Sequence, residues 1–187
     1  MNTGYAEAIR LAQENLRGLN LERVCVLSGA VFQGGDPLIP WFGENRSLES
    51  AKPAEKILWL HYLCSQAQPA NTGKLIAFRE LPSAKFYEPK FFERAENPLA
   101  KRFGSCPERL LQAGAKLGGT TADYGDYAVT LPMLPNIPVT YIVWGKDEEF
   151  GAQAKILFDS SAPRYLPTED LTVLASLGVY KLIEGLA

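Results

Sequence analysis

GDYAVTLPMLPNIPVTYIVWGKDEEFGAQAKILFD, residues 125–159, carries the strongest β-strand pattern of the chain. Residues 137–144 of this stretch are apolar on both faces, which is typical of a central strand that is covered on each side. A further strand is predicted at residues 154–159. The prolines between residues 132 and 138 predict a rigid connection before the central strand. This stretch therefore predicts the middle of a β-sheet.

Five carboxylates stand at the ends of these apolar runs: Asp126, Asp147, Glu148, Glu149 and Asp159. Like charges held together raise carboxylate pKa values unless a cation or a hydrogen-bond donor compensates them. Mg²⁺, a basic partner or the Arg79 side chain could supply that compensation. We therefore expect the carboxylates to converge beside one concave pocket, with Arg79 and Glu80 as a neighbouring pair. The alternative is a solvated turn whose charges point apart, which is common for charged loops.

Helices are predicted on both sides of this sheet region. The first follows Thr3, a residue that can cap it, and runs to a stop at Gly18. A second begins with Pro53 at its first position and is apolar nearly all round. Residues 105–108, Ser-Cys-Pro-Glu, match a capping box before another helix. The last helix is expected to start near Thr168.

Two further strands complete the predicted elements. One is the valine-rich stretch at residues 23–33, and the other is residues 74–81, which ends in the Arg79–Glu80 pair. Helices at both ends, with strands joined by short connections between them, favour an α+β fold over a doubly wound parallel sheet. We expect a single domain over residues 1–187, with a mostly antiparallel or mixed sheet and helices packed on it.

The composition is typical of a soluble globular protein and argues against two classes of partner. Hydrophobic residues make up 47% of the chain, charged residues 21%, and the formal net charge is -2. Non-specific nucleic-acid binding relies on clustered Lys and Arg, which this balance does not favour. No apolar run approaches the roughly 20 residues needed to cross a bilayer. With only Cys25, Cys64 and Cys106, and no evident signal peptide, we expect a reducing cytoplasm.

His61 is the only histidine, and it restricts the possible chemistry. Zinc sites with several histidines and two-histidine iron sites cannot form within one chain. His61 is therefore a candidate binding residue or imidazole base, and the alternative is a hydrogen-bonded core histidine in an apolar helix. His61 and Cys64 share a helix face and could contact one metal ion, although packing is the more common role of a cysteine. Three cysteines are too few for an ordinary iron–sulfur cluster.

Other familiar sites are missing or weakly indicated. The chain has no Walker loop and no GxGxxG motif, so a phosphate cradle is not supported. Aromatic residues after the FREL tetrapeptide, Phe86, Tyr87, Phe91 and Phe92, could wall an apolar pocket. Core packing is the alternative role for the same side chains.

Several motifs in order resemble an uncharacterised family of bacteria and archaea that is known only as a domain of unknown function. They are HYL at 61–63, GKLIAFREL at 73–81, FYEPKFFERAENPLAKRFG at 86–104, LGG at 117–119, GDYAV at 125–129, LPNIPVTYIVWGKDEEF at 134–150 and ILFDSSAPRYLPTEDL at 156–171. The resemblance covers residues 55–180 and implies a context in anaerobes. Some members are similar to domains joined to a four-cysteine iron–sulfur module of corrinoid methyl-transfer proteins. This chain lacks that module.

Three functions stay open at this point, and the residues name neither a reaction nor a cofactor. The first is a cytoplasmic binding module for a small molecule or metallocofactor, or for a corrinoid or iron–sulfur protein. The second is a hydrolase or lyase in which a carboxylate acts as general base and a divalent metal as Lewis acid. The third is a protein–protein interaction domain, which would display an exposed apolar patch.

Overall fold

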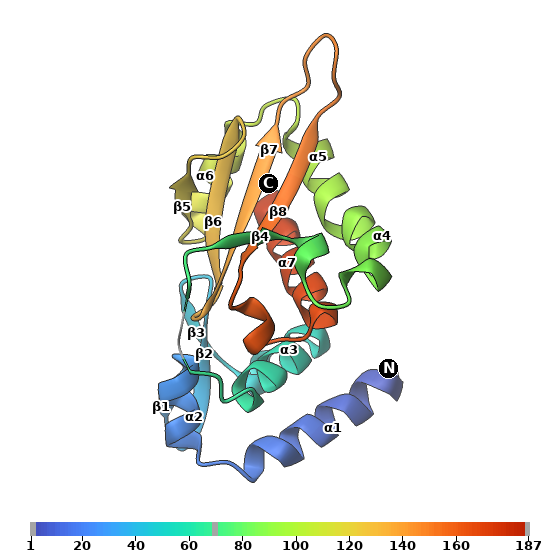
Figure 1. Ribbon diagram of the computed structural model, residues 1–187. Helices are drawn as coiled ribbons and strands as arrows, with labels where there is room; N and C mark the ends of the chain where they lie inside the picture. Colours follow the sequence, from blue (N-terminus) through green and yellow to red (C-terminus); the bar gives the residue numbers. More distant parts are fainter. Residues whose placement is uncertain (1–2, 69–70, 186–187) are drawn as a thin grey trace.

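The computed structural model describes residues 3–68 and 71–185, and its strands form two antiparallel sheets (Figure 1). The smaller sheet has the order β1 (Val31–Gln33), β2 (Asp36–Trp41), β3 (Glu44–Ser47). The larger sheet has the order β4 (Leu75–Ala77), β8 (Gln153–Asp159), β7 (Ile137–Trp144), β6 (Tyr127–Leu134), β5 (Thr120–Ala122). With helices packed on these sheets, the fold is α+β, as the sequence predicts.

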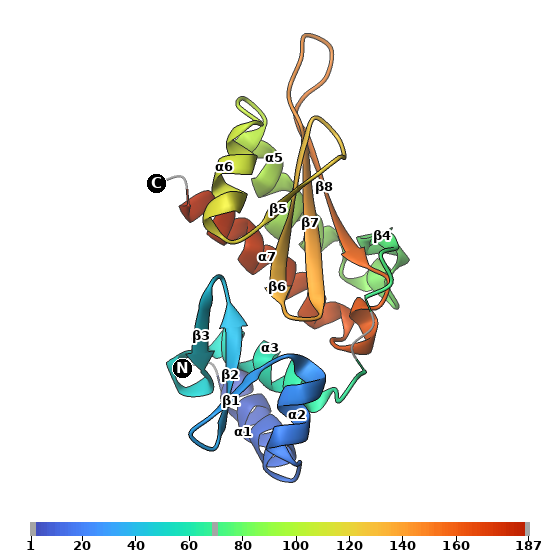
Figure 2. The ribbon, with the colours of Figure 1, turned by 90° about the vertical axis from the view of Figure 1, so that its left-hand side faces the viewer.

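Helices pack beside both sheets (Figure 2). The longer ones are α1 (Thr3–Arg17), α2 (Leu21–Ser28), α3 (Pro53–Cys64), α5 (Asn97–Phe103), α6 (Arg109–Lys116) and α7 (Thr168–Glu184). Shorter turns are η1 (Leu48–Ser50), η2 (Phe78–Glu80), η3 (Ala84–Phe86), α4 (Glu88–Phe91), the π-helix η4 (Phe92–Glu96) and η5 (Ala162–Arg164). Among the residues described, no helix has both the length and the apolar character needed to cross a bilayer.

The predicted central strand is confirmed, with the same bounds. β7 is the middle strand of the larger sheet, and β6 and β7 form a hairpin in which Leu134 pairs with Ile137. The proline-rich segment does not form a separate connection. Pro132 and Pro138 lie opposite each other within the strands, next to an irregularity in the ladder where a missing N–H donor is tolerated.

Helix α7 covers one face of the larger sheet, with α5 and α6 beside it (Figure 2). The buried Tyr141 of β7 donates a hydrogen bond to the carbonyl oxygen of Ala175 on α7, at 3.1 Å. Gly178, one turn further on, lies against the ring of Tyr141 with no room for a side chain. This close approach fixes the distance between α7 and the centre of the sheet.

The smaller sheet and the larger one share a continuous hydrophobic core. Its buried residues run from Ala12 on α1 to Leu182 on α7. Trp41 of β2 meets Trp59 of α3 edge to face, with ring centroids 5.3 Å apart. Helix α1 packs along α3 on the outside of this contact. The core therefore joins the amino-terminal helices to the larger sheet through α3.

The strand predicted at residues 23–33 is wrong over most of its length, because residues 21–28 form helix α2. The Asn20 side chain accepts a hydrogen bond from the Arg23 backbone N–H at 2.9 Å, which caps the helix. Gly29 has a φ of 73° and ends it. Val26 is 78% exposed while Val24 and Leu27 are buried, which is a helical pattern of burial.

Three other local predictions need correction. The strand predicted at residues 74–81 is limited to β4, since residues 78–80 turn into η2. The capping box at residues 105–108 does not form, because α6 begins at Arg109 and Glu108 occupies the cap position without a side-chain bond. Helix α1 does begin at Thr3, but the Thr3 side chain lies outside the described part of the chain.

Candidate functional site

The five predicted carboxylates do not meet at one place. Asp147, Glu148 and Glu149 lie in the loop between β7 and β8, at the upper end of the larger sheet in Figure 1. Asp126 is at that same end and accepts a hydrogen bond from the Gly145 backbone N–H at 2.8 Å. Asp159 closes the opposite end of β8, and seven residues of extended strand span roughly 20 Å. A cation shared by all five is therefore impossible.

The acidic loop is shaped by one of its own carboxylates. Asp147 Oδ1 accepts hydrogen bonds from the backbone N–H groups of Glu149 and Phe150, at 2.8 and 2.6 Å. Within the described residues, Glu148 and Glu149 have no side-chain hydrogen bond or ion pair, and both are exposed. This arrangement matches the alternative of a solvated, charged turn.

Asp159 has a structural role. It is buried and receives hydrogen bonds from five groups: the N–H and hydroxyl of Thr72, the N–H of Gly73, and the N–H and hydroxyl of Ser161. Burial alone would raise its pKa, but the bonds from Ser161 and Thr72 outweigh burial and lower the pKa to about 2. The ionised carboxylate therefore ties the end of β8 to the turn that precedes β4.

His61 is paired with a carboxylate that the sequence did not single out. Its Nδ1 lies 2.5 Å from Oδ2 of Asp170, so the pair links α3 to the first turn of α7. The hydrogen bond to Asp170 raises the pKa of His61, against the opposing effect of burial. The imidazole is 39% exposed, which makes it a hydrogen-bonded histidine at the surface of the core.

The cysteines do not join His61 in a metal site. Cys64 directs its Sγ toward the carbonyl oxygen of Ala12 at 3.7 Å, Cys25 is buried and Cys106 is exposed. Across residues 3–68 and 71–185, no three His, Cys, Asp or Glu side chains are grouped so that they could hold a metal ion. The soft-ligand arrangement considered from the sequence is therefore not formed.

A pocket of about 610 Å³ lies between η2, the α4–η4 segment and β8, and we call it the aromatic pocket. It is lined by Ala77, Phe78, Arg79, Glu88, Pro89, Phe91, Phe92, Glu96, Lys155 and Leu157. The rings of Phe78 and Phe91 stack with centroids 3.9 Å apart and form a flat buried wall. Phe92 adds a ring that is 53% exposed. Such a volume is in the range of small-molecule sites.

The edge of the larger sheet explains the polar lining of the aromatic pocket. β4 pairs only with residues 157–159 of β8, so the N–H of Ile156 lacks a strand partner. The carboxylate of Glu96, which is 6% exposed, accepts this N–H at 3.4 Å and the Lys155 ammonium at 3.1 Å. Glu96 ends the π-helix η4, and single π turns are frequent at functional sites.

Arg79 adds to the lining of the aromatic pocket a guanidinium that forms no hydrogen bond or ion pair with the described residues. Its neighbour Glu80 accepts a hydrogen bond from the Ala77 backbone N–H at 2.7 Å and closes η2. Glu80 therefore does not pair with Arg79, and no other described residue makes a hydrogen bond or ion pair with that guanidinium. Five N–H donors on a planar group in the lining of this pocket favour a carboxylate or another flat anion.

Sequence reasoning found part of this pocket. Phe78 and Arg79 of the FREL tetrapeptide line it, as do Phe91 and Phe92, whereas Glu80, Phe86 and Tyr87 do not. Glu96 and Lys155 were missed, because their pairing depends on where β4 stops along β8. The signal for them was Lys155, which interrupts the apolar run at residues 154–158, since an isolated charge often marks an exposed sheet edge.

Comparison with protein families matches most of the chain to one family. The model described as Domain of unknown function (DUF3786) matches residues 35–181. The chain belongs to this family. The match contains the whole aromatic pocket and the His61–Asp170 pair, and it begins before the residues on which the sequence resemblance was based. No curated protein and no solved structure matches the chain.

Proposed function

We propose that this DUF3786 protein is a binding module for a small organic anion with a flat apolar body. The supporting observation is the free guanidinium of Arg79 beside the stacked rings of Phe78 and Phe91. The body of the ligand packs against Phe92, the exposed ring in the lining of the same pocket, and its anionic group bonds to Arg79. The Lys155–Glu96 pair forms a polar border that selects how the ligand is oriented.

The metabolic setting of this proposal comes from the sequence resemblance. The resemblance implies relatives in anaerobes, some joined to a four-cysteine iron–sulfur module, and on that basis we propose a ligand from metallocofactor or one-carbon metabolism. A corrinoid or iron–sulfur protein is the corresponding partner, and the cytoplasm is the proposed compartment. The metal-dependent hydrolase or lyase has less support, because the described residues contain no group of three His, Cys, Asp or Glu side chains that could hold a metal ion. The interaction domain would depend on exposed rings such as Phe86 and Phe150.

Phenylacetate is a suitable probe, because it joins a single ring to a carboxylate. Its titration into ¹⁵N-labelled protein should shift the backbone amide signals of η2 and η4. Arg79→Gln should weaken binding at least about tenfold, the usual effect of losing a hydrogen bond to a charged group. Phenylacetamide has the same ring without the charge and should bind more weakly than phenylacetate.

Arg94→Gln is the matched control. Arg94 is also exposed, lies on η4 and is not part of the pocket lining, so this variant should bind phenylacetate like the wild type. Equal binding of phenylacetate by the two variants, or equal binding of acid and amide by the wild type, would contradict the proposal. Native mass spectrometry of protein purified without denaturation would then identify any ligand that co-purifies.

A further inference from the structure

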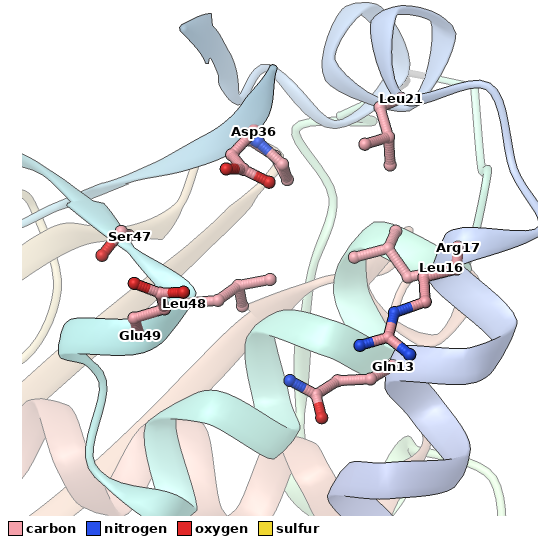
Figure 3. Close-up of a pocket in the computed structure, with 9 residues that line it drawn as sticks. Gln13, Leu16, Arg17, Leu21, Asp36, Ser47, Leu48 and Glu49 are labelled. Carbon is pink, nitrogen blue, oxygen red and sulfur yellow. The ribbon is translucent and has the colours of Figure 1, made fainter. Parts of the chain in front are cut away.

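A second hollow, of about 240 Å³, lies where the amino-terminal helices meet the smaller sheet (Figure 3). It is bounded by the end of α1, the start of α2, the start of β2 and the segment from Ser47 to Glu49. We call it the amino-terminal pocket. It shares no residue with the aromatic pocket. Its α1 and α2 walls precede residue 35, so the family match covers only one side of it.

Charges of both signs line the amino-terminal pocket without neutralising one another. Arg17 reaches toward it from α1, while Asp36 and Glu49 lie across from the helix (Figure 3). In the described part of the chain, none of these three side chains has a hydrogen bond or ion pair. Arg10, two turns earlier on α1, behaves differently, because it is bound by Glu7 and Glu14 at 2.7 and 2.6 Å.

The position of Arg17 in the last turn of α1 suits the helix dipole, but the dipole does not account for the two acids opposite. Unpaired groups of opposite sign around one hollow are complementary to a ligand that carries both signs. A carboxylate accepts two parallel N–H bonds from a guanidinium, and an ammonium offers three donors to carboxylates. The Gln13 amide, beside Arg17, adds another polar contact.

The rest of the lining is apolar. Leu16, Leu21 and Leu48 point into the space between the charged groups (Figure 3). The volume of the hollow is below the range of about 300–1,000 Å³ that holds drug-sized ligands. A small aliphatic group is therefore the body that fits beside the charges.

We infer that the amino-terminal pocket binds a free aliphatic α-amino acid. Its carboxylate bonds to Arg17, its ammonium to Asp36 and Glu49, and its side chain packs on Leu16 and Leu48. This site is independent of the proposed function, because it uses a different pocket on different elements. Binding here and binding of phenylacetate are therefore expected to fail or succeed separately.

Three probes of equal body separate the two charged contacts: L-leucine, N-acetyl-L-leucine, which lacks the ammonium, and L-leucinamide, which lacks the carboxylate. Calorimetric titration of the full chain should show leucine binding at millimolar concentrations. Each blocked derivative should bind at least about tenfold more weakly, because it leaves a charged group without its partner. Absence of leucine binding, or equal binding of the three probes, would overturn the inference.

Variants locate the contacts. Arg17→Gln and Glu49→Gln should each weaken leucine binding about tenfold or more, while Arg23→Gln and Glu22→Gln on α2 should not change it. All four side chains are exposed, so folding is not at risk, and circular dichroism can verify this. Loss of binding in the α2 controls, or unchanged binding in both pocket variants, would place the leucine elsewhere. Arg79→Gln should leave leucine binding intact.

Discussion

Asp159 gathers more hydrogen bonds than the other carboxylates considered, and its protonation is expected to set the acid stability of the protein. Its pKa is about 2 in the folded chain against an ordinary value of 3.8. The hydrogen-bonded Asp159 carboxylate therefore stabilises the fold fully at pH values above its ordinary pKa of 3.8. This stabilisation is lost as the pH falls through the pKa of Asp159 in the folded chain. Asp159→Asn should lower the free energy of unfolding by about 2 kcal/mol at neutral pH.

Urea unfolding at neutral pH and at about pH 2 measures this effect. The difference in free energy of unfolding between wild type and Asp159→Asn should shrink as the wild-type carboxylate becomes protonated. Asp126→Asn is the control. Asp126 is exposed, and among the described residues its carboxylate accepts one hydrogen bond, from the backbone N–H of Gly145. If the difference in free energy of unfolding between the wild type and Asp159→Asn stays constant with pH, the charge of Asp159 is not the cause of the stabilisation.

The contribution of His61 to stability has the opposite dependence on pH. Asp170 raises the pKa of His61 above 6.5, so its contribution is fully present below that value and is lost as pH rises through the folded pKa. His61→Gln should therefore destabilise the protein more near pH 6 than near pH 9. The chain has one histidine, so a single imidazole ¹H resonance reports its titration directly.

The variant Asp170→Asn should lower the pKa of His61, because it removes the principal cause of the shift. Glu169→Gln, a neighbouring substitution, should lower it less, since Glu169 acts only through its charge at longer range. An imidazole resonance that titrates at or below the ordinary value in the wild type would contradict the pairing seen in the structure.

Among secondary-structure elements, strand direction explains why the shared carboxylate site was not found. Consecutive strands of a parallel sheet end at the same edge, whereas consecutive strands of an antiparallel sheet end at opposite edges. The sequence predicted a mostly antiparallel sheet, and β7 and β8 are antiparallel. The acids after β7 and the acid at the end of β8 must therefore lie at opposite edges of the sheet. The prediction of convergence did not follow from the predicted fold.

The stretch at residues 21–33 shows a second limit. Its valine content favours a strand. The structure has a helix at residues 21–28, because Asn20 caps the start of the helix and Gly29 ends it. By contrast, β7 and the start of α7 were predicted with the right bounds. In both places the local pattern and the tertiary packing agree, since β7 is buried on both faces and α7 lies on it.

Gly178 is expected to be intolerant of substitution because it sets how closely α7 approaches β7. A Cβ at this position would overlap the hydroxyl of Tyr141 and approach the sulfur of Met133. Gly178→Ala should lower the free energy of unfolding by roughly 1–3 kcal/mol, although alanine is the better helix former. Urea unfolding followed by far-ultraviolet circular dichroism measures the change.

Gly151→Ala is the comparison, because a Cβ there meets nothing and the residue lies outside the helices and strands. It should change stability by no more than a few tenths of a kcal/mol. The double variant Gly178→Ala with Tyr141→Phe removes the hydroxyl that would collide, and part of the lost stability should return. If Gly178→Ala proves neutral, the packing of α7 on Tyr141 is looser than described.

At the scale of the whole molecule, the continuous core predicts that both sheets unfold together. Trp41 and Trp59 lie at the smaller sheet and α3, while Trp144 lies at the end of β7. In a Trp144→Phe variant, fluorescence reports on the first region alone and circular dichroism on the whole chain. Their urea transitions should coincide if residues 1–187 form the single domain predicted from the sequence. Separate midpoints would indicate two units.

The fold class could be predicted from the sequence, because most of the helical and strand-like patterns of apolar residues correspond to helices and strands of the structure. The pockets were not, since each is made by segments distant in the chain: η2 with η4 and β8, and α1 with β2 and η1. Arg79 was a candidate from its own position, but Arg17 and Glu49 come to line one pocket only in the folded chain, where α1 and η1 lie on two sides of it.

The contact between Glu96 and Ile156 has a consequence for how this protein behaves at high concentration. An edge strand with unpaired backbone groups can pair with a strand of a neighbouring molecule, which is a common route to fibril formation. Here the Glu96 side chain accepts the Ile156 N–H that an incoming strand would use. This contact thus protects the part of β8 that β4 leaves uncovered against the addition of a strand from another molecule.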